Sequence, residues 1–240
     1  MAYEELAPFY DELMGDALYG AWQQALAPHL PGVRVAVDLG CGTGRMAAWL
    51  AERVDRVYAV DQSPEMLAVA YDRFGHLPNV RWLESDLRHL ALPEPADLAL
   101  ASTDVLNYIL TRAAMERVLQ RVLASVRPGG KWVLDTLGPR RHQELREGAW
   151  HDVRDHLVIV HHTEVQGETI VHRVCGFVAI EENGEIYRRF DEEHVQRYWD
   201  PAALADLFER TGWAVTEVQG DFGKCPVDQA DRIVWVLEKR

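Results

Sequence analysis

Short runs of apolar residues alternate with amphipathic segments along residues 33–136 of this chain of 240 residues. The amphipathic segments place apolar residues at helical spacing, as at Leu67, Ala70 and Phe74, where Ser63 is positioned to cap a helix that opens at Pro64. A second helix is expected after residue 111 and should end at the Pro-Gly-Gly sequence of residues 128–130. This alternation predicts a parallel sheet covered by helices. The expected strands are residues 33–39, 56–60, 79–83, 96–101 and 131–135.

The pattern changes near residue 149. Residues 150–165, 169–181 and 185–199 are rich in β-branched and aromatic residues, and no helical segment separates them, so they predict antiparallel strands. Asn183-Gly184 is a two-residue hairpin signal. A turn there would place Phe177 opposite Phe190 and Arg173 opposite His194.

Helical spacing returns after residue 200, and two last strands are expected at residues 213–219 and 231–237. The sequence therefore predicts an α/β, Rossmann-like fold with a seven-stranded, mostly parallel sheet and helices on both faces. The expected core comprises residues 1–148 and 200–240, with residues 1–30 as an N-terminal helical lid. Residues 149–199 form an antiparallel β insertion after the fifth strand, expected to roof the substrate side and to serve as the contact of any homodimer.

Composition and charge argue against several classes of protein for this sequence. The chain is 48% hydrophobic with a net charge of −13, no apolar run is long enough to span a bilayer, and the acidic N-terminus is not a secretory signal, so a cytoplasmic enzyme is expected. Cys41, Cys175 and Cys225 are scattered, which argues against disulfides and a cysteine zinc site. The adjacent His161 and His162 would point to opposite faces of a strand, so no metal is expected. The acidity disfavours nucleic acid and favours a small-molecule acceptor.

The most informative stretch is VDLGCGTG, at the end of the first expected strand. Glycines at 40, 42 and 44 allow a tight turn and close approach of a ligand to the backbone. The spacing is GxGxG and not the GxGxxG of dinucleotide sites, and Asp38 would repel a pyrophosphate but attract an ammonium group. Asp61, at the end of the second strand, suits the two hydroxyls of a ribose. A ligand with a ribose and an ammonium but no phosphate fits S-adenosylmethionine.

The ordered segments VDLGCGTG, YAVDQSPEML, VRWLESDLRHL and RPGGKWVLDT resemble the motifs of class I S-adenosylmethionine-dependent methyltransferases. The opening YEELAPFYDELMGDALYGAW resembles the small-molecule branch that includes sugar-amine and glycine N-methyltransferases, and uncharacterised bacterial relatives. The resemblance implies S-adenosylmethionine as cofactor and S-adenosylhomocysteine as product, with an N-terminal tyrosine over the sulfonium. The residues then assigned to the cofactor are Tyr10, Asp38, Gly40, Cys41 through its backbone, Gly42, Gly44, Asp61, Gln62, Met66, Asp86, Leu87 and Ser102.

Acceptor-side candidates come from two segments. Asn107 and Tyr108 follow the fourth strand, where open parallel sheets place ligands, although a helix cap would explain polar residues there equally well. Residues 191–198 are polar on both faces of an expected strand, so they form either an exposed edge or one wall of a polar cavity. Glu193 and Arg197 are the substrate candidates there. Tyr10, Asn107 and His194 are the catalytic candidates.

The predicted function is methyl transfer by in-line displacement to a small nucleophile, with an amine preferred because the protein is acidic. A general base is needed only where the acceptor arrives protonated, and His194 or a carboxylate could then serve. Alternatives are a non-catalytic S-adenosylmethionine sensor and an RNA methyltransferase using the local cluster Arg140-Arg141. A nicotinamide-dependent oxidoreductase is disfavoured by the loop spacing and by Asp38.

Overall fold

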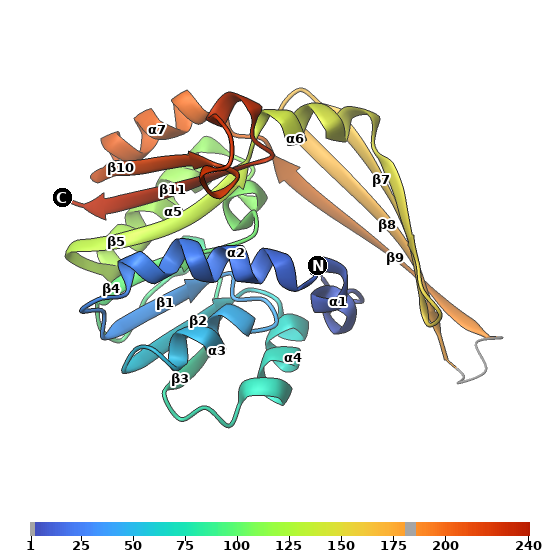
Figure 1. Ribbon diagram of the computed structural model, residues 1–240, viewed down its shortest axis with the longest axis horizontal. Helices are drawn as coiled ribbons and strands as arrows, with labels where there is room; N and C mark the ends of the chain where they lie inside the picture. The colour runs from blue at the N-terminus through green and yellow to red at the C-terminus, as the bar shows by residue number, and fades with distance from the viewer. Residues whose placement is uncertain (1–2, 181–185) are drawn as a thin grey trace.

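Two β-sheets organise the computed structural model, which describes residues 3–180 and 186–240 (Figure 1). Sheet A has seven strands in the order β10-β11-β5-β4-β1-β2-β3, and only β11 runs antiparallel to its neighbours. This confirms the predicted mostly parallel α/β sheet. Its strands are β1 Val35–Leu39, β2 Arg56–Asp61, β3 Val80–Glu84, β4 Ala96–Ala101, β5 Val126–Leu137, β10 Trp213–Gly220 and β11 Arg232–Lys239.

Helices cover both faces of sheet A and enclose two apolar clusters. On one face, α2 and α3 bury residues such as Trp22 and Leu50 against alternate positions of the strands, and on the other face α5 and α7 bury Leu119 and Phe208. Side chains alternate along β11, so Trp235 packs on the face covered by α5 and α7, whereas Val234 and Val236 pack on the face covered by α2 and α3. The helices are α1 Tyr10–Met14, α2 Asp16–Leu26, α3 Arg45–Ala51, α4 Pro64–Phe74, α5 Arg112–Ser125, α6 Pro139–Glu144 and α7 Pro201–Arg210.

Three of these helices begin with a side-chain cap. Each cap lies where the sequence predicted a cap or the start of a helix. Ser63, Thr111 and Asp200 each accept a hydrogen bond from a backbone N–H three residues later. Helix α5 ends at Ser125, shortly before the Pro-Gly-Gly sequence that was expected to stop it, but β5 begins earlier than predicted, so residues 128–130 lie within the strand. A break in the register between β4 and β5 accommodates this proline-glycine stretch.

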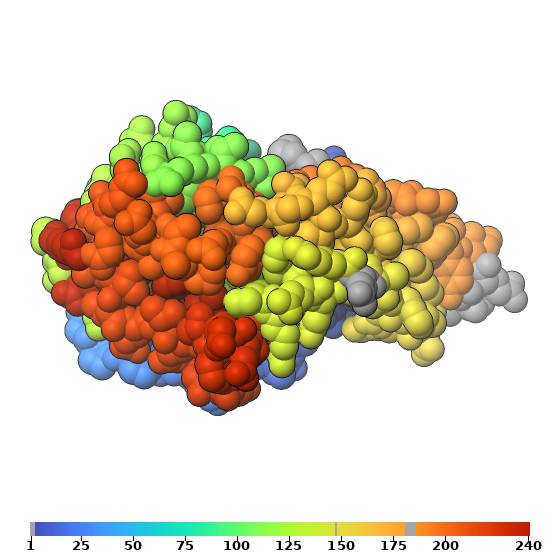
Figure 2. Space-filling view, turned by 90° about the horizontal axis from the view of Figure 1, so that it is seen from above, coloured from blue at the N-terminus to red at the C-terminus, as the bar shows by residue number. Residues whose placement is uncertain are grey.

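Sheet B is an antiparallel sheet of four strands, where the sequence predicted three. The chain reverses between β6 and β7 at residues 154–156, and the backbone N–H of Arg154 donates to the carbonyl of Leu157. The sheet extends from one end of the molecule (Figure 2). Its strands, in spatial order, are β6 Ala149–Val153, β7 Leu157–Gln166, β8 Thr169–Ala179 and β9 Tyr187–Arg197.

The predicted pairing of β8 with β9 was wrong by one residue. Arg173 lies opposite Glu193, and His194 lies opposite His172. The turn assigned to Asn183-Gly184 falls outside the described residues. A shift of one residue exchanges the two faces of a strand, so it changes which polar side chains of β9 face inward.

The N-terminal segment joins the two sheets. Tyr19 and Trp22 pack on sheet A. Tyr3 and Phe9 instead pack on sheet B, in an apolar cluster centred on Leu6. The other buried members of this cluster are Leu157, Ile159, Val174 and Phe190. Residues 3–14 therefore lie between the carboxyl ends of the parallel strands of sheet A and one face of sheet B.

Within the described residues, no helix combines the length and the apolar character needed to cross a membrane. The same residues contain no cluster of three or more histidine, cysteine or acidic side chains arranged for a metal ion.

Candidate cofactor and acceptor site

A cavity of about 470 Å³ lies where the first four strands of sheet A end. Loops after β1, β2, β3 and β4 line it together with the N-terminal segment and the 3₁₀ helix η4, Val105–Tyr108. Open parallel sheets bind their ligands at this edge. Nine of the twelve residues assigned to the cofactor line the cavity: Tyr10, Gly40, Gly42, Asp61, Gln62, Met66, Asp86, Leu87 and Ser102. Their roles stay predictions.

The glycine loop has the predicted shape. Gly42 has a φ of +54°, and a Cβ built on it would meet only the sulfur of Met66, at 3.9 Å, so the loop leaves open space on the cavity side. Gly44 does not line the cavity. A Cβ at Gly44 would lie 2.6 Å from the ring of Trp82, which shows that this glycine allows the start of α3 to pack closely. Cys41 is buried and also does not line the cavity.

Asp61 joins the glycine loop to the loop that follows β2. Its carboxylate accepts hydrogen bonds from the backbone N–H of Gly42 at 2.8 Å and from that of Ser63 at 2.9 Å. Burial raises the pKa of Asp61, while these backbone donors oppose the rise. The carboxylate lines the cavity, and each of its oxygens keeps a lone pair for a ligand hydroxyl.

Asp38 is fully buried behind the loop and does not line the cavity. Neither carboxylate oxygen has a hydrogen-bond partner of normal geometry among the described residues, although the backbone N–H of Ala47 lies near enough to favour the charged form. Burial, and next the charge of Asp61, raise the pKa of Asp38 to about 7. A buried carboxyl without a partner is costly. A cation bound at the loop would offset that cost, so this pair of carboxylates fits the ammonium and ribose of S-adenosylmethionine.

Asp86 lies after β3 and lines the cavity beside Leu87. Its carboxylate accepts from the Arg88 backbone and forms an ion pair with the Arg88 side chain. The Arg88 side chain holds the pKa of Asp86 below its usual value. Arg88 also lines the cavity, which the sequence analysis did not predict.

Asn107 does not line the cavity, although it was a catalytic and substrate candidate. It is completely buried, its amide nitrogen donates to the carbonyl of Arg197, and its amide oxygen accepts from the backbone N–H of Leu137. Asn107 thereby ties η4 to β9 and β5. Tyr108, the next residue, does line the cavity.

The two substrate candidates on β9 also lie outside the cavity lining. Glu193 is on the exposed face and pairs with Arg173 at 3.2 Å. Arg197 pairs with Glu168, donates to the carbonyl of Leu110, and lies over the ring of Trp199. Alternation along the strand turns Glu192, His194 and Gln196 inward instead, and all three are buried.

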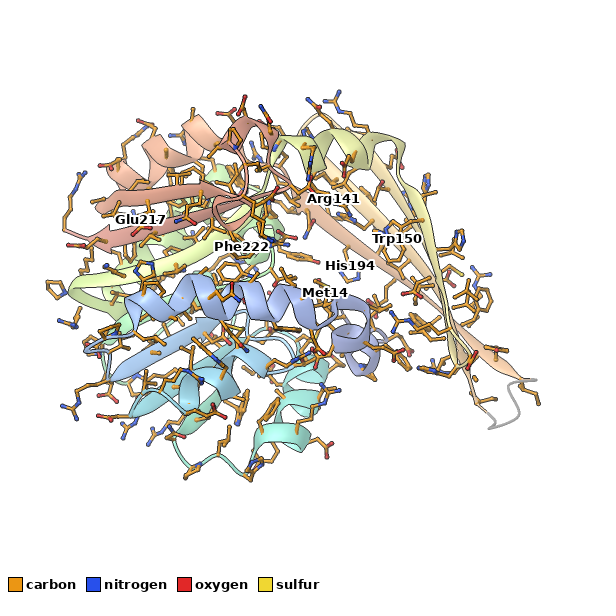
Figure 3. All side chains as sticks on the ribbon, in the orientation of Figure 1. Met14, Arg141, Trp150, His194, Glu217 and Phe222 are labelled. Atoms are coloured by element: carbon orange, nitrogen blue, oxygen red, sulfur yellow. The ribbon has the colours of Figure 1, made fainter. Side chains whose placement is uncertain are left out.

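His194 lies on the side of β9 that faces the N-terminal segment (Figure 3). Its Nε2 is 3.0 Å from Glu192 and its Nδ1 is 3.3 Å from the hydroxyl of Tyr108. The hydroxyl of Tyr108 is 2.7 Å from that of Tyr3, which lines the cavity. His194 does not touch the cavity itself, but two tyrosines connect it to the cavity.

The sequence analysis missed Tyr3 and Glu192. Glu192 accepts from the backbone N–H groups of Tyr3, Glu5 and Leu6, and it so holds the N-terminal segment against β9. Tyr3 has a φ of +66°, which is uncommon for a residue with a side chain. The correct register would have identified Glu192 as the inward acid, whereas nothing in the sequence indicated a contact with residues 3–6.

A second unpredicted feature lies after β4. Thr103 and Asp104 both have a positive φ, and the backbone N–H of Asp104 donates to the carboxylate of Asp135. Arg232 pairs with both acids. Strained backbone of this kind collects at functional sites. The ion pairs fix the loop that carries Ser102 and Thr103 into the cavity.

Comparisons with known proteins agree with this geometry. Residues 36–130 match the family described as "Methyltransferase domain". YqeM of Bacillus subtilis (strain 168), a candidate methyltransferase, is 27% identical over 244 residues, which cover 100% of this chain and 98% of that protein.

The fold also occurs in solved methyltransferase structures. The S-adenosylmethionine-dependent methyltransferase from Clostridium acetobutylicum ATCC 824 has a TM-score of 0.85 at 21% identity, covering 100% of this chain and 99% of that one. CalS10, an amino pentose methyltransferase from Micromonospora echinaspora solved with S-adenosylmethionine bound, has a TM-score of 0.73 at 23% identity, covering 94% and 91%.

The family match covers the strands and loops that build the cavity, and the two carboxylates and open glycine loop fit the ammonium and ribose of the ligand. The chain therefore contains a methyltransferase domain and is an S-adenosylmethionine-dependent methyltransferase, with S-adenosylmethionine as its cofactor.

Proposed function

We propose that this methyltransferase methylates the nitrogen of a small-molecule amine. One observation carries the proposal: the lining of the cavity includes the three tyrosines Tyr3, Tyr10 and Tyr108 and the carboxylates of Asp61 and Asp86. Its only cationic side chain among the described residues is Arg88, which Asp86 already pairs. Such a lining favours a cationic or neutral acceptor over an anionic one.

The same three tyrosines keep their hydroxyl protons. Burial raises the pKa of Tyr3, of Tyr10 and of Tyr108, so each presents a neutral phenol to the cavity. A phenol offers an oxygen that can accept a hydrogen bond from an amine and a ring face that attracts a cation. The fold shared with an amino pentose methyltransferase supports the same acceptor class.

When bound, S-adenosylmethionine supplies a methyl group that is already activated, because its leaving group is a neutral thioether. The chain has to place the acceptor in line, exclude water and remove a proton where the acceptor is an ammonium. Tyr10 opens α1, and Tyr3 packs edge-on against it with ring centroids 5.3 Å apart. These two rings cover the cavity from the N-terminal side.

The test is a panel of acceptors incubated with radiolabelled S-adenosylmethionine. The amines are glucosamine, glycine, ethanolamine and benzylamine; succinate and catechol represent carboxylates and phenols. We expect transfer to at least one amine and none to succinate, with the methylated nitrogen identified by mass spectrometry. Transfer to succinate or catechol alone would reject an amine acceptor. Binding of S-adenosylhomocysteine without transfer to any compound would favour the sensor alternative.

A further inference from the structure

A continuous chain of hydrogen bonds leads from the cavity to a buried acid on sheet B. It runs from the hydroxyl of Tyr3 to that of Tyr108, then to Nδ1 of His194, and from Nε2 of His194 to Glu192, with distances of 2.7, 3.3 and 3.0 Å. The side chains of His194 and Glu192 are 5% and 4% exposed. Water therefore does not compete for these contacts.

The charge of Glu192 fixes the direction of every bond in this chain. Burial raises its pKa, but the hydrogen bonds from His194 and from the backbone N–H groups of Glu5 and Leu6 outweigh burial, and the net pKa is lowered. An ionised carboxylate only accepts, so in the neutral imidazole of His194 the proton is on Nε2 and Nδ1 is an acceptor. Tyr108 must then donate to Nδ1, and Tyr3 must donate to Tyr108.

This direction of donation leaves the Tyr3 end of the hydrogen-bond series free to contact the ligand. Tyr3 donates its only proton to Tyr108, so the oxygen of Tyr3 meets the cavity as an acceptor. A group that fits there must carry a proton to donate. This matches an ammonium or amine and does not match a carboxylate.

A second series of hydrogen bonds on sheet B leads from His161 through His172 to Gln196. His161 Nε2 lies 3.1 Å from Nδ1 of His172, and His172 Nε2 lies 3.0 Å from the amide oxygen of Gln196, whose side chain lies near Tyr108. The other ring nitrogen of His161 has no partner, as expected for the unprotonated end. Burial lowers the pKa of His161 and of His172 to about 4, so both stay neutral.

His194 is the only one of these three histidines that touches a carboxylate. The groups that face it are Glu192 on its own strand, His172 opposite on β8, Tyr108 of η4, and the ring of Tyr3, 4.6 Å away in the N-terminal segment. His161 on β7 also acts on it through space. Among them, only Glu192 can stabilise a positive charge on the imidazole.

We propose that His194 is the general base of the methyl transfer and that it takes the acceptor's proton through Tyr3 and Tyr108. The proton leaves the acceptor nitrogen for the oxygen of Tyr3, the proton of Tyr3 moves to the oxygen of Tyr108, and the proton of Tyr108 moves to Nδ1 of His194. Neither phenol changes charge, and one proton has moved to the imidazole. The freed lone pair on nitrogen then forms the bond to the methyl carbon, while the electrons of the breaking carbon–sulfur bond stay on sulfur.

Tyr3 touches the acceptor in this scheme, while Glu192 is a positioning residue that sets the tautomer of His194 and stabilises its charged form. The inference rests on the proposed amine acceptor. The proton returns to solvent along the same chain when product leaves.

The test compares rates of methyl transfer at about pH 7, where an amine acceptor is mostly protonated, and at about pH 10, where it is mostly free. We expect His194→Gln and Tyr3→Phe to lose about 100-fold in kcat at the lower pH. At the higher pH their rates should come within about fivefold of the wild type, because the acceptor no longer needs a base. His162→Gln, on the exposed face of sheet B, is the matched control and should match the wild type at both values.

A loss of the same size at both pH values would overturn the relay and leave His194 and Tyr3 as structural residues. Titration of S-adenosylhomocysteine into each variant by calorimetry shows that the cofactor site is intact, since the relay predicts affinities within about threefold of the wild type.

A second measurement needs no acceptor and so separates this proposal from the proposed function. Nitrogen NMR of protein labelled at histidine, with His194→Gln used for assignment, reports which ring nitrogen of His194 carries the proton. The proposal requires a proton on Nε2. A proton on Nδ1 would overturn it even if amines are methylated, and absence of amine methylation with a proton on Nε2 would reject the acceptor class while the polarity of the chain stands.

Discussion

Asp61 combines a structural and a binding role in one side chain, since it holds Gly42 and Ser63 while facing the cavity. We expect Asp61→Ala to weaken binding of S-adenosylhomocysteine by about 1.5–3 kcal/mol, the range for hydrogen bonds to a charged group. Isothermal titration calorimetry measures this directly. Asp55→Ala removes an exposed carboxylate that pairs with Arg34 and does not line the cavity, so it should leave the affinity unchanged. Equal affinities for the two variants would remove Asp61 from the binding site.

Asp38 predicts a pH dependence of stability in the free protein. Its pKa of about 7 in the fold exceeds the ordinary 3.8, so between these values the folded state binds more protons than the unfolded state. The free energy of unfolding therefore falls as pH rises through this window, by at most about 4 kcal/mol for this group.

Asp38→Asn should remove that decline and make the free protein about 1–3 kcal/mol more stable than the wild type at about pH 8. Urea unfolding at about pH 5 and pH 8 measures the difference. The variant should also bind S-adenosylhomocysteine more weakly, because the compensating charge is lost. A wild type whose stability is flat across this range would show that Asp38 keeps a normal pKa.

At the scale of helices and strands, the sequence correctly predicted the features that depend only on residues close together in the chain. Ser63 and Thr111 start their helices because a side-chain oxygen can satisfy a free N–H whatever the rest of the chain does. Glycine spacing and the acids at strand ends placed the cofactor loops in the same way. The pairing of β8 with β9 is different, because a turn signal such as Asn183-Gly184 does not fix register against competing side-chain packing.

That packing is visible at Gly176, which lies opposite Phe190. The phenyl ring covers the glycine, and a Cβ there would lie 2.0 Å from the ring. In the observed register Gly176 is paired with Phe190, and the side chains of Glu192 and His194 face inward. The predicted register paired Phe177 with Phe190 instead. The sequence also did not show which face of β9 turns inward, so Glu193 and His194, which lie on opposite faces, were both named as candidates.

Gly176→Ala should therefore disturb sheet B. The added methyl displaces Phe190 from the cluster around Leu6, and we expect a loss of about 1–3 kcal/mol, as for overpacked cores. Thermal unfolding followed by circular dichroism measures the change. Gly20→Ala is the control: it lies inside α2 with nothing within 4 Å of the added Cβ, so it should stabilise the protein by up to about 1 kcal/mol. A stability equal to wild type for Gly176→Ala would mean that Phe190 does not hold the register.

At the scale of the whole molecule, the N-terminal segment and sheet B form one roof over the cavity. They share the Leu6 cluster and the bonds from Tyr3, Glu5 and Leu6 to Glu192. A ligand that contacts Tyr3 or Tyr10 should therefore stabilise both parts together.

Hydrogen exchange with and without S-adenosylhomocysteine tests this coupling. We expect slower exchange in residues 3–14 and in β8 and β9 in the same samples, although the predicted cofactor contacts all precede sheet B. Exchange in β10, at the far edge of sheet A, should not change. Protection of residues 3–14 alone would show that the two parts move independently.

The bond from Tyr3 to Glu192 joins residues 189 positions apart, and it has a consequence for how the protein is made. Tyr3 is translated well before its partner, which is added 189 residues later. The roof over the cavity therefore cannot close until β9 has been made, although the residues of the glycine loop are already present in the nascent chain. Methyl transfer, as proposed here, must wait until translation has passed β9.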